Sequence, residues 1–206
     1  MASKVAEKLL SAAVDSFAAD GFNGSTTKAI SDRAGCTEGS LFRLFGSKEK
    51  LFEAAVVRAF QTGRMPNEEF ARILENDDNF ERGLRKAMLE FYERLDDRYI
   101  RITTFAALDR PDSARDLLAD TVPSRTLSHT IEREVYRGNL RDDIKPHTAA
   151  LALTMSLWQF SLCSRVMASE FKTTSREAKR AAVKNFVEIW FRGMRKNTPK
   201  TPRKNH

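Results

Sequence analysis

Apolar residues recur every three or four positions along most of the chain, which is the spacing of one face of an α-helix. No segment shows a convincing alternation of apolar and polar residues, the pattern of a half-buried strand. The sequence therefore predicts an all-α protein. Helices are expected at about residues 4–20, 27–34, 37–45, 48–62, 80–97, 98–108, 112–137 with an interruption near 123, 148–164 and 175–196, and a short helical turn at 67–74.

The two short helices at 27–34 and 37–45 are separated by a tight turn. Thr26 and Thr37 are suited to cap the two helix N-termini with their hydroxyls, and Gly35 ends the first helix at little steric cost. The core-facing residues of the second helix are Leu41, Leu44 and Phe45. This arrangement is typical of a helix-turn-helix, although such pairs also occur in ordinary helical bundles.

Several motifs surround this pair: Ala-x-x-x-Phe-Ala-x-x-Gly-Phe from Ala13 to Phe22, Thr26-Thr27, Ile30, Arg33-Ala34-Gly35, Gly39-Ser40-Leu41-Phe42 and Phe45-Gly46-Ser47-Lys48-Glu49-x-Leu51-Phe52. Together they resemble the N-terminal domain of the TetR family over residues 5–55, without a gap. The rest of the chain resembles the family only in length and helical layout. The resemblance implies a DNA-binding domain at 1–47 and a helical effector-binding and dimerisation domain at 48–197. The polar, proline-interrupted composition of residues 198–206 predicts a disordered basic tail.

A helix-turn-helix presents the N-terminal half of its second helix to the major groove. Residues at the start of the first helix and at the start of the helix that follows the pair are expected to contact DNA as well. The predicted DNA-binding residues are Thr26, Thr27, Lys28, Glu38, Gly39, Ser40, Phe42, Arg43 and Lys48. Thr27, Ser40 and Lys48 are expected to contact phosphates, whereas Arg43 and Lys28 are the candidates for purine edges.

Three positions of the second helix affect how it can approach DNA. Gly39 allows close approach to the groove. Glu38 either accepts a hydrogen bond from a cytosine amino group or repels phosphate, and the sequence does not choose between these roles. Many TetR relatives have Tyr where Phe42 stands, so the resemblance implies that a hydroxyl contact to phosphate is lost here and that Arg43 compensates.

The stretch 148–164 contains no charged residue. Its Ser, Thr and Gln residues make a membrane span a poor interpretation, and a helix that is apolar nearly all round is otherwise buried on both sides. The resemblance implies that this helix and the one at 175–196 form a four-helix interface with a second copy of the chain. A monomeric core remains the alternative.

Effector binding is expected among aromatic residues of the second domain. The candidate pocket residues are Phe91, Phe105, Trp158, Phe160 and Cys163, and each is also compatible with plain core packing. Because none of them is charged, the expected small-molecule effector is apolar or aromatic.

The net charge of +7 does not by itself argue for DNA binding, because basic residues gather after residue 191 while the first 50 residues are nearly balanced. A solvated tail and nonspecific phosphate attraction both remain open for this end. The charged N-terminus does not resemble a signal peptide, and two isolated cysteines suit a reducing compartment, so a cytoplasmic protein is expected.

The three histidines lack metal-ligand spacing, and no phosphate loop or nucleophile elbow occurs. We therefore expect no enzyme, no catalytic residue, no metal and no cofactor. The sequence predicts a homodimeric regulator, most simply a repressor that a ligand releases from a palindromic DNA operator. The alternative is a helical small-molecule- or partner-binding protein whose helix-turn-helix no longer reads a specific operator.

Overall fold

The computed structural model of the protein describes residues 2–112, 123–166 and 175–196. Within these ranges the regular structure is helical, apart from an isolated bridge between Leu140 and Arg195. The all-α prediction is confirmed. No helix in the described part of the chain is long and apolar enough to cross a membrane.

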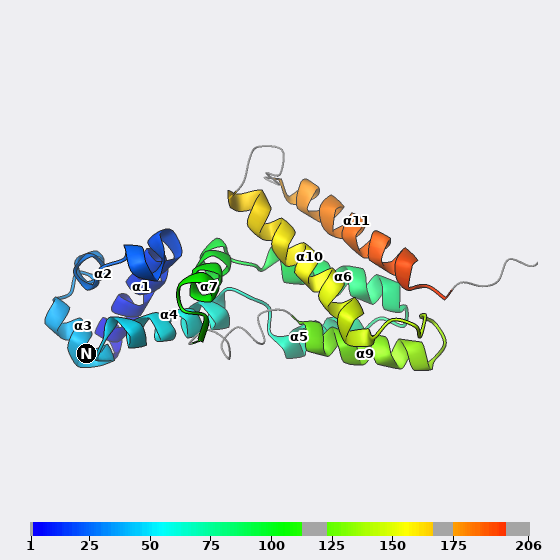
Figure 1. Ribbon diagram of the computed structural model, residues 1–206, viewed down its shortest axis with the longest axis horizontal. Coiled ribbons are helices and arrows are strands. Elements are labelled where there is room, and N and C mark those ends of the chain that lie inside the picture. The colour runs from blue at the N-terminus through cyan, green and yellow to red at the C-terminus, as the bar shows by residue number, and fades with distance from the viewer. Residues whose placement is uncertain (1, 113–122, 167–174, 197–206) are drawn as a thin grey trace, which may run out of the picture.

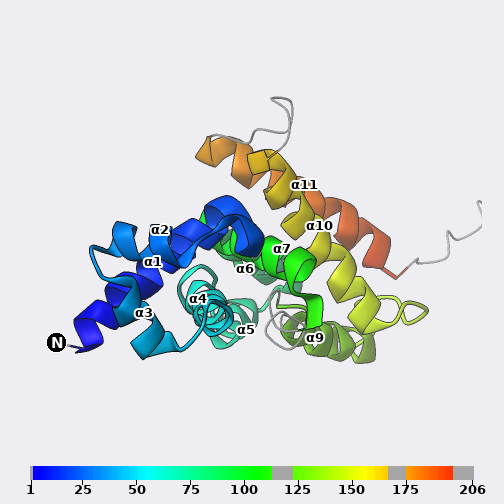
Figure 2. The ribbon, with the colours of Figure 1, turned by 60° about the vertical axis from the view of Figure 1, so that its left-hand side comes forward.

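Helices from the N-terminal third of the chain form one end of an elongated molecule, and the later helices form the other end (Figures 1 and 2). We call α1 to α3 the headpiece and α4 to α11 the body. The helices are α1 (Ala2–Gly24), α2 (Thr27–Ala34), α3 (Glu38–Phe45), α4 (Lys48–Thr62), α5 (Asn67–Glu75), α6 (Phe80–Glu93), α7 (Asp97–Asp109), α9 (Ser124–Tyr136), α10 (Pro146–Val166) and α11 (Arg176–Met194).

Helix α1 is the central support of the headpiece, because it packs against α2, α3, α4 and α7. Its apolar stripe includes Leu9 and Phe17, which are fully buried. The Phe52 ring of α4 meets the Phe17 and Phe22 rings edge-on, at centroid distances of 4.9 and 5.2 Å. Edge-to-face rings at these distances are favourable and fix relative orientation. The angle between α1 and α4 is therefore set by aromatic packing.

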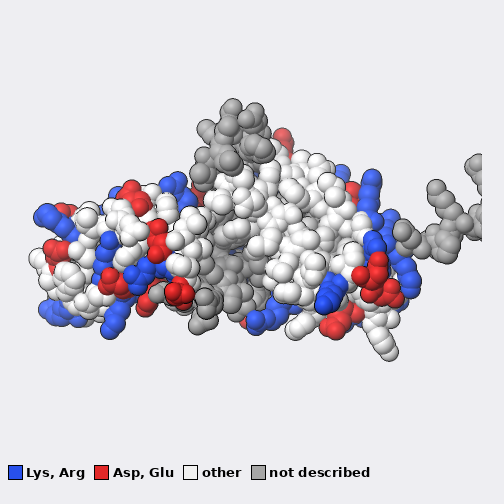
Figure 3. Space-filling model, viewed as in Figure 1, with Lys and Arg blue, Asp and Glu red and all other residues white. Residues whose placement is uncertain are grey.

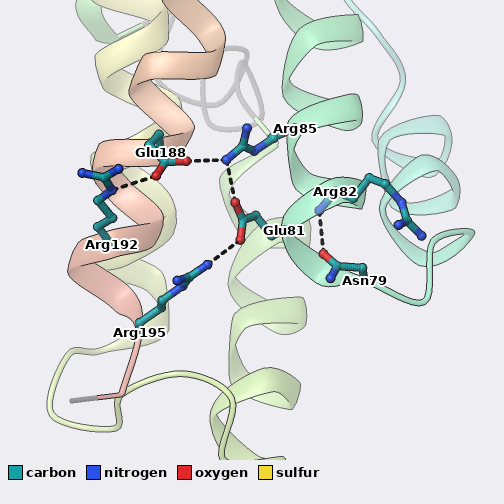
Figure 4. Close-up of polar contacts among 7 residues, drawn as sticks. All are labelled: Asn79, Glu81, Arg82, Arg85, Glu188, Arg192 and Arg195. Atoms are coloured by element: carbon teal, nitrogen blue, oxygen red, sulfur yellow. Dashed lines mark hydrogen bonds and ion pairs between the residues drawn. The ribbon is translucent and has the colours of Figure 1, made fainter. Parts of the chain in front are cut away.

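In the body, α6 is flanked by α5 on one side and by α10 and α11 on another. The Trp190 indole of α11 donates to the carbonyl of Ala149 in α10 at 2.7 Å. Charged residues link α11 to α6 as well (Figure 4). Arg85 pairs with Glu81 at 2.6 Å and with Glu188, and Arg195 donates to Glu81 at 2.9 Å. The C-terminal helix α11 is thus held to α10 by an indole hydrogen bond and to α6 by an ion-pair network.

The predicted long helix at 80–97 is wrong, because the chain breaks after Glu93 and begins α7 at Asp97. Asp96 caps α7, since its carboxylate accepts from the Arg98 amide at 2.7 Å. Leu95 lies in this break but is buried, with 4% of its surface exposed. The helical spacing of apolar residues therefore continues through Leu95, although α6 has already ended and Asp96 caps the start of α7.

Two smaller expectations also changed. The predicted turn at 67–74 is a complete helix, α5, and α1 runs past residue 20 with a kink at Gly21. Gly21 has a φ of 72° there, so the glycine ends the straight part of the helix as predicted. The predicted tail at 198–206 and most of the segment from 112 to 123 lie outside the described residues.

Candidate DNA-binding surface

Local hydrogen bonds define the two helices of the predicted helix-turn-helix. The Thr26 hydroxyl accepts from the Ala29 amide at 3.1 Å, and the Thr37 hydroxyl accepts from the Ser40 amide at 3.3 Å. Between them Gly35 adopts the left-handed conformation, with φ 64° and ψ 36°. The predicted caps are confirmed. The first backbone amides of a helix have no partner within the helix, and each cap supplies one. The ends of α2 and α3, and the turn between them, are therefore determined by residues of this local segment.

The buried sides of α2 and α3 anchor the pair to the rest of the headpiece. Ile30 of α2 and Leu41 of α3 are fully buried, and Leu44 and Phe45 are partly buried against the same core. Cys36 in the turn is also partly buried, as a small apolar residue would be. The opposite side of α3 is consequently left for solvent or a partner.

That outward side contains Gly39, Phe42 and Arg43, all exposed. The Phe42 ring keeps 45% of its surface accessible, which is unusual for a residue that normally contributes to a core. A Cβ atom added at Gly39 would meet nothing within 4 Å. Nothing within the protein therefore requires glycine at this position, and its lack of a side chain leaves the N-terminal part of α3 open to close approach.

The predicted phosphate contacts lie beside this surface. Thr27 begins α2 and donates its hydroxyl hydrogen to Glu38 of α3. Ser40 shares a hydrogen bond of 3.0 Å with Thr37. Lys48 begins α4, and its ammonium group lies 4.5 Å from the centre of the Phe22 ring. Helix N-termini favour anions, so three such ends carry the predicted phosphate-contacting side chains.

Acidic and basic side chains are interspersed over the headpiece in the view of Figure 3. Lys28 is exposed and lies 3.9 Å from Asp32 on the same helix. Next to the headpiece, at the start of α4, Glu49 follows Lys48. The Glu49 backbone amide and then the Ser47 hydroxyl hold the pKa of the Glu49 carboxyl below the usual value. The headpiece is therefore not a uniformly basic surface, as its balanced sequence charge predicted.

The C-terminal end of α1 is attached to α7 of the body. Arg101 donates to the carbonyls of Ala18 and Ala19 at 2.6 and 3.1 Å. The Phe22 amide donates to the Asp109 carboxylate at 3.0 Å. These contacts satisfy the backbone on both sides of the Gly21 kink, so the headpiece is joined to the body by directed hydrogen bonds as well as by apolar packing.

The five predicted pocket residues have different neighbours in the structure. Phe105 lies beside Gly21 of α1, and the Phe91 ring meets Phe70 edge-on at 6.4 Å. Trp158 packs on Tyr99 at 5.5 Å, whereas Phe160 packs on Tyr92 and Phe186. Cys163 lies 3.4 Å from the side-chain amide of Gln159.

Two observations that the sequence did not predict concern the body. The hydroxyls of Tyr92 and Ser161 are buried and have no hydrogen-bond partner among the described residues. A separate cavity of about 340 Å³ opens between α5, α6 and α9. Its lining residues are Leu74, Glu75, Asp77, Asp78, Phe80, Thr130, Arg133, Glu134 and Arg137. No local motif marks these residues, because the cavity forms where α9 packs beside the consecutive helices α5 and α6, which lie far from it in the sequence.

Known proteins that are similar to this chain are transcriptional regulators with a helix-turn-helix. Residues 9–55 match the sequence profile described as bacterial regulatory proteins, tetR family. The chain is 28% identical over 141 residues to the HTH-type transcriptional repressor AcnR of Corynebacterium efficiens, an alignment that covers 67% of this chain and 70% of AcnR.

Solved structures extend the similarity beyond the headpiece. A TetR-family regulator from Mesorhizobium loti has a TM-score of 0.73 at 18% identity, over 95% of this chain and 99% of its own. SmeT, the repressor of a multidrug efflux pump in Stenotrophomonas maltophilia, has a TM-score of 0.67 at 21% identity, over 96% and 94% of the two chains. The headpiece and body together therefore have the fold of these regulators.

Proposed function

Since the chain belongs to the TetR family and is a DNA-binding transcriptional regulator, we propose that it is a homodimeric repressor that a small-molecule effector releases from a palindromic operator. The observation that carries the proposal is the outward side of α3. Gly39, Phe42 and Arg43 are exposed there, on a helix whose other side is buried in the headpiece.

The proposed contacts divide into two kinds. Arg43 and Lys28 read purine edges, because a guanidinium pairs with two acceptors of guanine. The DNA backbone is contacted by Thr26, Thr27, Ser40 and Lys48. Phe42 contacts a sugar or a thymine methyl group. Backbone contacts fix register, whereas base contacts supply sequence preference.

A dimer is proposed through α10 and α11. The side chains exposed on these helices include small and apolar residues, namely Ala152, Met155, Ala178, Ala181 and Ile189. Ile189 has 72% of its surface exposed and Met155 has 40%. Over these two helices the face in Figure 3 is largely without charged groups. Burying such a face against a second copy is favourable. A dimer that binds two half-sites needs its two reading helices about one DNA turn apart.

The effector is proposed to bind in the body near Trp158 and Phe160. These rings are partly buried on α10, and Trp158 packs on Tyr99 of α7, the helix that holds α1. The unpartnered hydroxyls of Tyr92 and Ser161 favour an effector that is largely aromatic or apolar with a polar group. An effector that binds one arrangement of α7 better than another shifts the headpiece and so changes DNA affinity.

The decisive test is selection from a pool of random duplex DNA by the full-length protein. Enrichment of a palindrome supports the proposal, and the enriched duplex then serves as the probe for effector screening. A folded dimer that enriches no sequence contradicts it.

A second function is favoured by the exposed Phe42 ring, which carries no hydroxyl for a phosphate. In this function the chain binds a small molecule or protein partner and the headpiece does not read an operator. The two functions differ in the salt dependence of binding. Operator reading combines steep salt dependence with sequence preference, and the alternative shows neither.

A further inference from the structure

Thr27 and Glu38 contact each other across the turn between α2 and α3. The Thr27 hydroxyl donates its hydrogen to Oε1 of Glu38. Thr27 is the first residue of α2, and Glu38 is the first residue of α3. The carboxylate is therefore held at the N-terminal ends of two helices, where backbone amides and helix dipoles favour an anion.

A DNA phosphate would use the same hydroxyl. Under the proposed function Thr27 donates to the backbone of the operator, and a threonine hydroxyl has only one hydrogen to donate. A carboxylate and a phosphate oxygen are both anionic acceptors. In the free protein Glu38 thus occupies the position on Thr27 that a phosphate takes in the complex.

We propose that Glu38 determines sequence specificity by competing with a DNA phosphate for the Thr27 hydroxyl. Glu38 thereby weakens binding to every duplex except one with a cytosine amino group at the major-groove position that faces Glu38. The inference rests on the proposed function and extends it. On other sequences Glu38 either keeps Thr27 from the phosphate or stands unpaired beside it. On the operator the released carboxylate accepts from cytosine N4, which is the base group that acidic side chains read.

Charge alone does not account for this role, because the headpiece contains another acid in a different setting. Asp32 is exposed in the second half of α2 and lies 3.9 Å from Lys28. It is the last residue but two of its helix, so it is far from the amides at the N-terminus. Asp32→Asn is therefore a control that removes the same charge without freeing Thr27. It also releases Lys28, a proposed base contact, so it does not lower sequence preference.

The experiment measures DNA binding by fluorescence anisotropy for the wild-type protein, Glu38→Gln and Asp32→Asn. The probes are the duplex that the wild-type protein enriches from a random pool, and the unselected pool at the same length. Glutamine keeps the length and shape of the side chain, so the exposed start of α3 stays intact. Its neutral amide oxygen is a weaker acceptor than a carboxylate, so it competes much less with a phosphate for the Thr27 hydrogen. Circular dichroism confirms that each variant is folded.

Glu38→Gln is expected to tighten binding to the unselected pool about tenfold, the size expected when a dimer loses two close like-charge contacts with phosphate. Binding to the enriched duplex changes less, so the specificity ratio falls, and preference for the read cytosine weakens. Asp32→Asn leaves the ratio unchanged or raises it, because it releases Lys28 for the base that Lys28 is proposed to read.

Equal tightening on both probes, or the same loss of ratio in Asp32→Asn, overturns the inference and leaves the proposed function standing. So does an unchanged ratio in Glu38→Gln. A wild-type protein that enriches no duplex overturns both, and this result is distinguished because it appears before any variant is made.

Discussion

Replacing Arg43 by alanine separates DNA recognition from folding. Arg43 is exposed in the last turn of α3, and no hydrogen bond or ion pair joins it to the residues that the structure describes. The substitution therefore removes no contact of the free protein, and alanine is a good helix former. The free energy of unfolding is expected to stay within about 0.5 kcal/mol of the wild-type value, as for other surface changes of this kind.

The expected loss of DNA affinity follows from the proposed contact. A two-point pair between arginine and guanine contributes about 1–3 kcal/mol of discrimination. A homodimer on a palindrome makes the contact twice, so the dissociation constant for the operator rises at least about 30-fold. At the base that Arg43 reads, the variant accepts all four base pairs with similar affinity.

Arg33→Ala supplies the matched control for this experiment. Arg33 is also exposed in the last turn of a headpiece helix, but that helix is α2, whereas α3 is the helix that lies in the major groove in the proposal. Both variants lose one positive charge per chain. Fluorescence anisotropy on the enriched duplex, and on duplexes with each base changed in turn, compares them at several salt concentrations.

If Arg43→Ala weakens binding to all duplexes by the same factor, Arg43 is a phosphate contact and does not read a base. In that case the slope of binding affinity against salt concentration also falls, by about one released ion per contact. The same loss of base preference in Arg33→Ala equally contradicts base reading by Arg43.

Three further predictions concern glycine positions and pH. Gly39→Ala leaves the free energy of unfolding unchanged or raises it by up to about 1 kcal/mol, because the added Cβ meets nothing within 4 Å and alanine favours helix. Its affinity for the operator falls. Urea unfolding measures the first effect and fluorescence anisotropy the second, and an unchanged affinity contradicts the close approach of α3 to DNA. Gly63→Ala destabilises the protein by about 1–3 kcal/mol or more, because its Cβ would lie 2.3 Å from Tyr99 Cβ and 2.7 Å from the Ala59 carbonyl oxygen; an unchanged urea midpoint contradicts this packing. For Asp96, burial raises the pKa, but hydrogen bonds from the Arg98 side chain and amide outweigh it and leave the pKa below the usual value. The stabilisation is therefore present above about pH 4, the usual aspartate range, and is lost as the pH falls through the folded-state pKa. Acid titration of Asp96→Asn should show a smaller loss of stability than the wild-type protein, and equal losses exclude this role.

The sequence predicted the headpiece well because its structure depends on local interactions. Thr26, Thr37 and Ser47 each accept from an amide three residues later. Such pairs are visible in a linear sequence. The apolar face of α4 was also predicted, since its buried residues follow helical spacing within one element.

Interactions between helices could not be predicted in the same way. Thr27 and Glu38 were both expected at the DNA surface, but their contact joins residues 11 positions apart on different helices. It depends on the angle at which α2 and α3 dock. The positions of Phe105 beside Gly21 and of Trp158 on Tyr99 likewise follow from packing among distant segments, so their aromatic character alone did not distinguish core from pocket.

The attachment of α7 indicates what kind of motion an effector can cause in this chain. The N-terminal end of α7 is joined to the end of α4, because the Asp96 amide donates to the Gly63 carbonyl at 3.0 Å and Tyr99 packs closely on Gly63. Its C-terminal end is joined to α1, through the hydrogen bond from the Phe22 amide to Asp109. A shift of α7 therefore carries α1 and α4 together, and these two helices support α3 on its buried side. In the proposed dimer, an effector would then change the distance between two intact reading helices and leave the surface of each one unaltered.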